Sequence, residues 1–488
     1  MSESFSTRRG HTGLSFRDPS GRLLLAGDRV FRFVAQDAAP ELRTFLGTPG
    51  ALNAISRGLL VRTIFLDTTD TETLFDDASV AQSRPLVYET VVVEHERVAI
   101  RSFPYEWPPE MLHAAGELML DLAESALTEN FSLKDATPYN VLFRSARPVF
   151  VDLLSFEPRD PCDPTWLPLN QFTRTILLPL LVNKYFGFRL DQLLTISRDG
   201  LEPSDVIRLC GPVERFLPPF LTLVSLPYWL GKKQPQEQVS IYQPKRLGDP
   251  ERASFILRQQ FKRLRRQLAR VEPEVRYSGW SDYMTPDKFF SLEYLRTKEA
   301  FVAQALEEYR PKRVLDVGCN TGHFSLLAAR AGATVVALDQ DPVVVGAVWR
   351  QAVAEDLEIL PLVVNLARPT PAIGWRNEEC PSFLDRMRGA FEAVLMLAVL
   401  HHMLVTEQIP LPAILELAAE LTSDLLIIEF ISPRDPMFRR IVRGREELFE
   451  GLTQNVFEET ANNWFDLVRG ERLNQTRWLY LLRKRSSV

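Results

Sequence analysis

The most constraining feature of this 488-residue chain is the stretch that begins at residue 312, KRVLDVGCNTGHFSLLAARAGATVVALDQDP. It predicts a buried strand at Val314–Val317, a turn and helix over Gly318–Ala331, and a second strand at Val335–Leu338. Asp339 ends the second strand, where a carboxylate can accept both hydroxyl groups of a ribose because each oxygen accepts one O–H. The stretch therefore predicts a βαβ unit that binds an adenosine-containing ligand.

The turn of this unit distinguishes between adenosine ligands. A dinucleotide fingerprint that starts at Gly318 needs glycine at positions 320 and 323, where the chain has Asn320 and His323. The turn instead resembles the first motif of class I S-adenosylmethionine (SAM) methyltransferases, which Asp316, Gly318 and Gly322 match. Asn320 replaces the middle glycine, and asparagine adopts left-handed backbone angles more readily than other side chains do. A Rossmann-like unit without a ligand is the alternative.

The rest of the C-terminal half continues the alternation of strands and helices. Strands are predicted at Leu357–Leu366, Phe391–His402 and Asp424–Pro433, before a hairpin in WFDLVRGERL and TRWLYLLRK. The resemblance covers Tyr283–Lys484 and implies an α/β fold with a Rossmann-like seven-stranded sheet. Asn365 holds the place where family members carry an acidic residue against the adenine. The cofactor-binding residues implied for SAM are Asp316, Gly318, Cys319, Asn320, Gly322, Asp339, Gln340, Asn365 and Leu397.

Three residues are candidates for the chemistry. Methyl transfer depends mainly on positioning and requires a general base only when the acceptor holds a proton with a high pKa. His401 and His402 follow the fourth predicted strand, at the sheet edge where ligands bind in open α/β folds, and either imidazole could accept such a proton. The competing interpretation is that they cap a helix or pack. Glu429 on the fifth strand is the alternative base or substrate anchor.

Nearly the whole chain resembles the host-specificity nodulation methyltransferases and their relatives. The resemblance rests on six segments. They are FRDPSGRLLL, FSLKDATPYNVLF, PVFVDLLSFEP, LNQFTR, NLARPTPAIGW and IIEFISPRDPMF. It implies transfer of a methyl group to an oxygen or nitrogen of a small molecule or saccharide.

The first half carries a second signature. Asp135 stands five residues before Asn140, and Asp152 ends an apolar strand 17 residues after Asp135, which resembles the catalytic loop and metal-binding aspartate of protein kinases. Lys134 is the first lysine in the chain, however, and no Gly-rich phosphate loop precedes it. We therefore expect a degenerate kinase-like module that does not transfer phosphate. A phosphotransferase that uses these three residues, and a non-catalytic scaffold, are the alternative functions.

The domain organisation follows from the linker-like composition of Gly231–Glu251. We expect an α+β accessory module, possibly kinase-like, at residues 1–231, a linker with a basic helix at 232–270, and the methyltransferase domain at 271–488. In the first module we expect helices at Pro40–Leu60 and Pro108–Leu127. The strands expected there are Arg22–Leu25, Val30–Val34, Leu86–Val93 and Arg97–Ser102. The basic helix at Ala253–Arg270 is expected to pack on an acidic neighbour rather than to bind nucleic acid.

The composition of the chain limits the binding partners and the cellular compartment that we expect. The formal net charge of −6 gives no overall positive field, so we expect no nucleic-acid partner. Ile176–Val182 and Phe216–Leu230 are the longest apolar stretches, and both are too short to span a membrane, so we expect them to be buried. The four cysteines are single, without metal-ligand spacing, and the first residues lack the apolar run of a signal peptide. A cytoplasmic protein without a metal is expected, and its oligomeric state is not predicted.

Overall fold

We describe the protein from a computed structural model, in which residues 18–76, 90–231, 246–282 and 291–486 are placed. The chain begins with an antiparallel sheet of strand order β1-β2-β4-β3. Its strands are β1 (Gly21–Ala26), β2 (Arg29–Ala35), β3 (Thr63–Phe65) and β4 (Thr90–His95). The predicted strand at Arg97–Ser102 is wrong, because these residues form a loop. Residues 86–89 of the predicted strand Leu86–Val93 lie outside the described residues.

The predicted helix at Pro40–Leu60 is divided in two. The structure contains α1 (Ala39–Leu46) and α2 (Pro49–Ser56), and a third helix, α3 (Thr68–Asp76), follows β3. The break occurs because Thr48 has an extended backbone, with ψ 147°, and its side chain accepts a hydrogen bond from the Ala51 N–H as the N-cap of α2.

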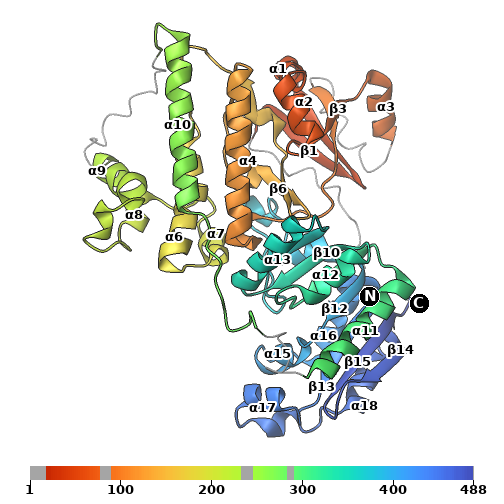
Figure 1. Cartoon of the computed structure of the whole chain (residues 1–488). Coiled ribbons are helices and arrows are strands. Elements are labelled where there is room, and N and C mark those ends of the chain that lie inside the picture. Colours follow the sequence, from red (N-terminus) through yellow and green to blue (C-terminus); the bar gives the residue numbers. More distant parts are fainter. Residues whose placement is uncertain (1–17, 77–89, 232–245, 283–290, 487–488) are drawn as a thin grey trace.

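Two long helices run side by side through the first half (Figure 1). They are α4 (Pro109–Thr128) and α10 (Pro250–Arg270), and α10 buries one apolar face formed by Leu257, Phe261, Leu264 and Leu268. On its polar side, the Arg265 guanidinium pairs with the carboxylates of Asp121 and Glu124 on α4. This basic helix therefore packs on an acidic neighbour.

Short elements complete the first half. They are β5 (Phe131–Leu133), β6 (Val141–Arg144), β7 (Arg147–Phe150), β8 (Phe156–Pro158), α5 (Leu169–Phe172), α6 (Leu178–Phe186), α7 (Leu190–Ile196), α8 (Pro203–Val206) and α9 (Leu226–Gly231). Ile176–Val182 is buried as predicted. The burial predicted for Phe216–Leu230 is wrong in part, because short turns replace a continuous helix and leave Phe216 and Leu230 more than 60% exposed. Among the described residues, no helix has the length and apolar character needed to cross a membrane.

The C-terminal half is built on a seven-stranded sheet of order β11-β10-β9-β12-β13-β15-β14, in which β15 runs antiparallel to β13. The strands are β9 (Arg313–Val317), β10 (Thr334–Asp339), β11 (Ile359–Val363), β12 (Phe391–Met396), β13 (Thr422–Ile431), β14 (Phe465–Arg472) and β15 (Arg477–Lys484). The helices are α11 (Leu292–Tyr309), α12 (His323–Arg330), α13 (Pro342–Ala354), α14 (Phe383–Met387), α15 (Leu400–Val405), α16 (Leu411–Leu421), α17 (Pro436–Val442) and α18 (Gln454–Ala461). This arrangement confirms the predicted fold class.

The fourth predicted strand is too long. Instead of continuing to His402, β12 ends at Met396 and α15 begins at Leu400. Ala398 takes a left-handed backbone angle, φ 58°, between the two elements, and such an angle turns the chain out of the sheet. The turn brings both histidines onto a helix at the end of the sheet.

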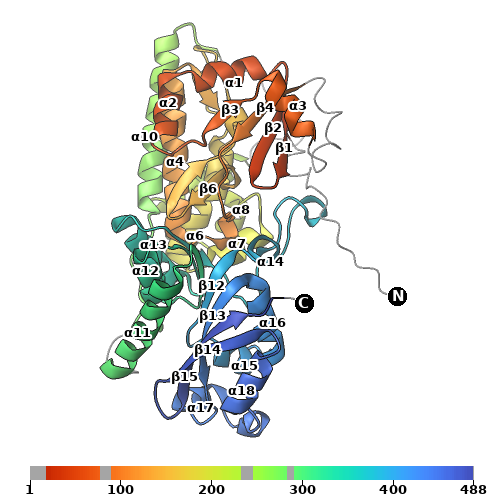
Figure 2. The same cartoon turned by 90° about the vertical axis from the view of Figure 1, so that its right-hand side faces the viewer.

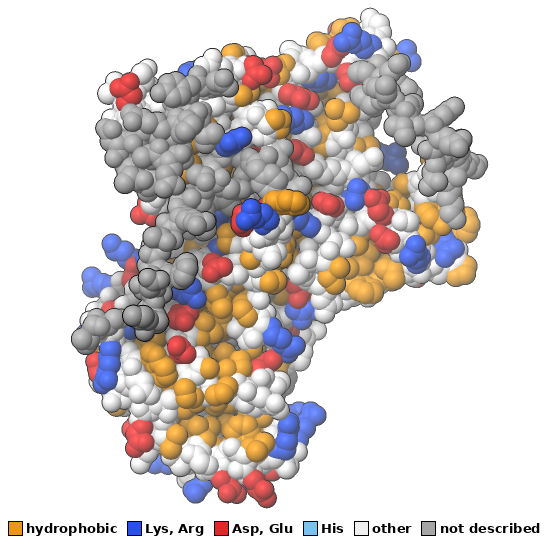
Figure 3. Space-filling model, turned by 180° about the vertical axis from the view of Figure 1, so that it is seen from behind, with side chains coloured by type: hydrophobic (Ala, Val, Ile, Leu, Met, Phe, Trp, Pro, Cys, Tyr) orange, Lys and Arg blue, Asp and Glu red, His pale blue; other side chains and the backbone are white. Residues whose placement is uncertain are grey.

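The two halves share a buried interface (Figure 2). The carboxylate of Glu106, from the first half, pairs with the guanidinium of Arg386 and accepts a hydrogen bond from the Thr370 hydroxyl. The side chains of both Glu106 and Arg386 are buried. The indole N–H of Trp349 also donates to the Ala146 carbonyl at 3.1 Å. On the surface, acidic and basic side chains are interspersed over the face in Figure 3, so neither sign dominates it.

Candidate active site

The turn after β9 depends on left-handed backbone angles. The φ angles are 71° at Gly318, 52° at Asn320 and 84° at Gly322. A Cβ atom at Gly318 would lie 2.3 Å from a Cγ atom of Val399, so glycine is required there for space as well as for conformation. Asn320 supports its own turn, because its side-chain oxygen accepts the Thr321 N–H at 2.6 Å. The expectation that asparagine can replace the middle glycine of the turn is confirmed.

Asp339 stands at the end of β10, opposite this turn. One of its oxygens accepts the Asn320 N–H at 3.0 Å and the other accepts the Asp341 N–H at 2.9 Å. Burial raises the pKa of this carboxyl group above its ordinary value, and the backbone N–H donors partly offset that shift. Each carboxylate oxygen keeps acceptor capacity for a further donor.

A cavity of about 150 Å³ lies at the carboxyl ends of β9, β10, β11 and β12. Six of the predicted cofactor residues line it, namely Gly318, Asn320, Asp339, Gln340, Asn365 and Leu397. Asn365 donates to the Gln340 side-chain oxygen at 3.1 Å, and its own oxygen accepts the Ala367 N–H at 2.9 Å. One lone pair of that oxygen remains for a ligand. We refer to this space as the cofactor pocket.

Three other predicted cofactor residues, Asp316, Cys319 and Gly322, do not line the pocket. Asp316 is 2% exposed and accepts a hydrogen bond from the Ser325 hydroxyl at 2.6 Å. Burial raises the pKa of Asp316 to about 6, against the lowering effect of that hydrogen bond and of Lys298. Cys319 is buried, and Gly322 caps the N-terminus of α12.

Several pocket residues were not predicted. They are Trp280, Val317, Val364, Leu366, Ala367, Ala398, Val399, Met403, Thr406 and Glu407. Trp280 precedes the βαβ unit by more than 30 residues, and its backbone carbonyl accepts a hydrogen bond from the Asn320 side chain at 3.0 Å. No sequence pattern marks it, because this link forms only when the chain folds.

The two adjacent histidines have different surroundings. His402 lines the cofactor pocket and contacts the Trp280 ring edge to face, with centroids 5.7 Å apart. His401 is 1% exposed, packs near Phe438, and neither of its ring nitrogens has a hydrogen-bond partner among the described residues. Burial lowers the pKa of both imidazoles, most strongly that of His401, and the charge of Arg477 adds to the effect. The neutral imidazole is therefore favoured at both positions.

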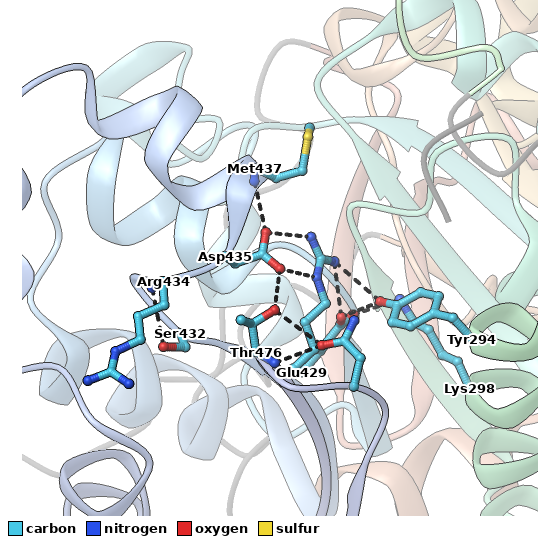
Figure 4. Close-up of polar contacts among 10 residues, drawn as sticks. Tyr294, Lys298, Glu429, Ser432, Arg434, Asp435, Met437 and Thr476 are labelled. Atoms are coloured by element: carbon cyan, nitrogen blue, oxygen red, sulfur yellow. Dashed lines mark hydrogen bonds and ion pairs between the residues drawn. The ribbon is translucent and has the colours of Figure 1, made fainter. Parts of the chain in front are cut away.

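Glu429 is enclosed in a network of buried polar side chains (Figure 4). Its carboxylate is 0% exposed, pairs with the Lys298 ammonium at 2.7 Å and the Arg477 guanidinium at 3.3 Å, and accepts the Tyr294 hydroxyl. Arg477 also pairs with Asp435 at 2.8 Å. Burial raises the pKa of Glu429, but Lys298 and Arg477 outweigh it and hold the pKa below the ordinary value. The charge is thus paired inside the protein.

A second cavity, of about 730 Å³, adjoins the cofactor pocket. Trp280, Gln340, His402 and Thr406 line both spaces. The remaining walls come from α15, from α17 and from the turn after α17, and they include Val405, Met437, Arg440, Ile441, Arg443 and Arg445. We refer to this space as the adjoining cleft.

The residues of the kinase-like signature have different hydrogen-bond partners. Asn140 donates to the Ser155 hydroxyl at 3.3 Å, and that hydroxyl donates to Asp152 at 2.6 Å. Asp152 also pairs with Arg32 of β2, whereas Asp135 accepts a hydrogen bond from the Gln171 side chain at 2.8 Å. Within the described ranges, no group of three or more His, Cys, Asp or Glu residues is arranged to hold a metal ion.

Residues 291–479 match the family described as a methyltransferase domain. Over 462 residues the chain is 29% identical to nodulation protein NoeA of Rhizobium meliloti (strain 1021), which covers 92% of this chain and 91% of NoeA. Among solved structures, magnesium protoporphyrin IX methyltransferase (ChlM) from Synechocystis PCC 6803 with bound SAH is 20% identical, covers 46% of this chain and 94% of that chain, and has a TM-score of 0.30. N-methyltransferase NodS from Bradyrhizobium japonicum WM9, also with SAH, is 13% identical, covers 44% and 100%, and has a TM-score of 0.31.

Proposed function

We propose that this chain, a SAM-dependent methyltransferase, moves a methyl group to an oxygen or nitrogen of a small molecule or saccharide that enters the adjoining cleft. The observation that carries the proposal is the position of His402, which lines both the cofactor pocket and the cleft. A group at this junction can contact an acceptor and lie beside the cofactor at the same time.

The residues of the cofactor pocket fit SAM. The Asp339 carboxylate can accept the two ribose hydroxyls, and the free lone pair of the Asn365 oxygen can accept the adenine amino group. The missing side chain at Gly318 leaves room for the Val399 side chain, which lines the pocket beside it, and the Leu397 side chain offers an apolar wall. Asp316 is buried beneath the turn, and its carboxylate would place a negative charge near the methionine end of SAM.

His402 would act as the general base. SAM supplies a methyl carbon bonded to a positive sulfur, which is an electrophile. The acceptor atom bonds to this carbon while the carbon–sulfur bond breaks, the bonding pair stays on sulfur, and the acceptor's proton moves to an imidazole nitrogen of His402. The lowered pKa of His402 keeps the imidazole unprotonated at neutral pH, as this role requires.

The test removes this imidazole. His402→Ala should lower turnover by about 10²–10⁴-fold, while SAM affinity, measured by calorimetry, stays nearly unchanged. His323→Ala is the matched control, because His323 lies on α12 outside both cavities and pairs with Glu299 at 3.1 Å. In the unmodified enzyme, kcat/KM should fall only at a pH below the ordinary imidazole pKa of about 6.5, because the pKa of His402 is lowered. Near-normal turnover of His402→Ala contradicts the general-base role, and a loss confined to SAM affinity assigns His402 to the cofactor side.

We also propose a cytoplasmic location. Its support is that all four cysteines, Cys162, Cys210, Cys319 and Cys380, carry free thiols in the structure. Free thiols are typical of a reducing compartment.

A further inference from the structure

The adjoining cleft has an unusual distribution of charge. Three guanidinium groups, those of Arg440, Arg443 and Arg445, line it, and no acidic side chain is among the described residues that line it. Two nearby carboxylates are engaged elsewhere. Asp435 pairs with the buried Arg477, and Glu446 accepts the Gly444 N–H.

Some other surface arginines of the C-terminal half are paired with a carboxylate. Arg313, Arg330 and Arg388 each pair with a glutamate on the surface. The three cleft arginines have no ion pair within the part of the chain that the structure describes, and all three are exposed. Three like charges on one short segment repel one another, and a bound anion would remove that repulsion.

Apolar and aromatic side chains also line the cleft. Val405, Met437 and Ile441 form apolar surface, and the Trp280 ring, 39% exposed, stands between the cleft and the cofactor pocket. Aromatic rings pack well against the flat C–H faces of sugar rings, while the side chains of Thr406 and Gln340 can hydrogen-bond to hydroxyl groups. Arginine binds carboxylate, sulfate and phosphate groups through its planar fork of donors.

We propose that the methyl acceptor is an acidic saccharide, bound with its anionic group on Arg440, Arg443 and Arg445 and with the atom to be methylated beside His402. This inference rests on the proposed function and names the acceptor class of that site. A long polyanion such as nucleic acid fits less well, because the net charge of the chain is −6 and the charges on the face in Figure 3 are interspersed. The carboxylate and the sulfate or phosphate ester share the same recognition chemistry, so the experiment must distinguish them.

The experiment uses the full chain with SAM labelled in the methyl group. The acceptors are oligosaccharide pairs that differ in one group only, namely a glucose unit against glucuronate, glucose 6-sulfate or glucose 6-phosphate. We expect the acidic member of a pair to be methylated at least tenfold faster than the neutral one at low concentration. The preference should weaken as salt is added, because exposed charges are screened. The favoured pair distinguishes a carboxylate from a sulfate or phosphate ester.

The variant with Arg440→Gln, Arg443→Gln and Arg445→Gln should raise the acceptor KM by about tenfold and leave kcat and SAM affinity unchanged. Arg439→Gln is the matched control, because Arg439 lies on the same helix but does not line the cleft. Equal methylation of neutral and acidic members, or methylation of none while SAM binds, overturns the proposal. Stronger inhibition by a short RNA duplex than by the acidic oligosaccharides overturns it in favour of nucleic acid. Absence of SAM binding would instead contradict the proposed function itself.

Discussion

Replacing Glu429 by glutamine tests whether the buried network supports the fold or the chemistry. Glutamine keeps the shape but removes the charge that Lys298 and Arg477 share, and both cations are at most 3% exposed. Removing one partner of a buried ion pair costs about 3–5 kcal/mol, because the remaining charge is left without compensation in a medium of low polarity. For a domain of about 200 residues, 1 kcal/mol shifts the melting temperature by roughly 2–4 °C. We therefore expect Glu429→Gln to lower Tm by about 6–20 °C in differential scanning calorimetry.

A surface pair supplies the matched control. Glu420 pairs with Arg388 at 3.0 Å, and both side chains are more than 40% exposed, so Glu420→Gln should cost about 0–1 kcal/mol.

The contribution of Glu429 to stability should also depend on pH, in a direction that its pKa determines. The folded-state pKa of Glu429 lies below its ordinary value, so its stabilising effect is complete above the ordinary pKa of about 4.3 and is lost as the pH falls through the folded-state pKa. The Tm difference between the Glu429→Gln variant and the unmodified protein should accordingly be constant above about pH 5.5 and shrink in stronger acid. A Tm drop no larger than that of the control refutes this reasoning, and normal stability with lost turnover would return Glu429 to the list of candidate bases.

Two further predictions concern the ligand sites. Asp339→Ala should remove two hydrogen bonds to the ribose and weaken SAM binding by about 1–3 kcal/mol, or roughly 5- to 150-fold, in calorimetry; unchanged affinity would remove Asp339 from the site. The first half should not transfer the γ-phosphate of ATP, because the Asp152 carboxylate is already engaged by Arg32 and Ser155 and a Gly-rich loop is missing. Radiolabelled ATP provides the assay, and phosphate transfer that disappears in Asp135→Asn would favour the phosphotransferase alternative.

The parts of the cofactor pocket that could be predicted are those whose requirement is local. Gly318 and Asn320 are visible in the sequence because a turn with positive φ angles restricts the residue type at each position. Asp339 is visible because it ends a strong apolar strand at a fixed spacing from that turn. The comparisons confirm the class of enzyme that these residues indicated.

The parts that could not be predicted depend on how distant segments meet. Trp280 reaches the pocket through a hydrogen bond to Asn320, 40 residues away, and the cleft arginines stand beside it only because α17 packs against α15. Strand periodicity also could not show that Glu429 is inaccessible. On a central strand, the alternation of side chains between the two faces does not separate buried from exposed residues, because helices cover both faces of the sheet. Ile428, Glu429 and Phe430 are accordingly all buried.

The two histidines show what a single helix turn adds to a sequence motif. His401 and His402 are equivalent candidates in the sequence, since both follow β12 at the ligand-binding edge of the sheet. Successive residues on a helix point about 100° apart, so the two imidazoles point in different directions although their ring centroids lie 4.2 Å apart. His401 faces the core beside Phe438, and His402 faces the junction of the cofactor pocket and the adjoining cleft. The left-handed turn at Ala398 determines which histidine reaches the junction, because it sets the angle at which the chain enters α15.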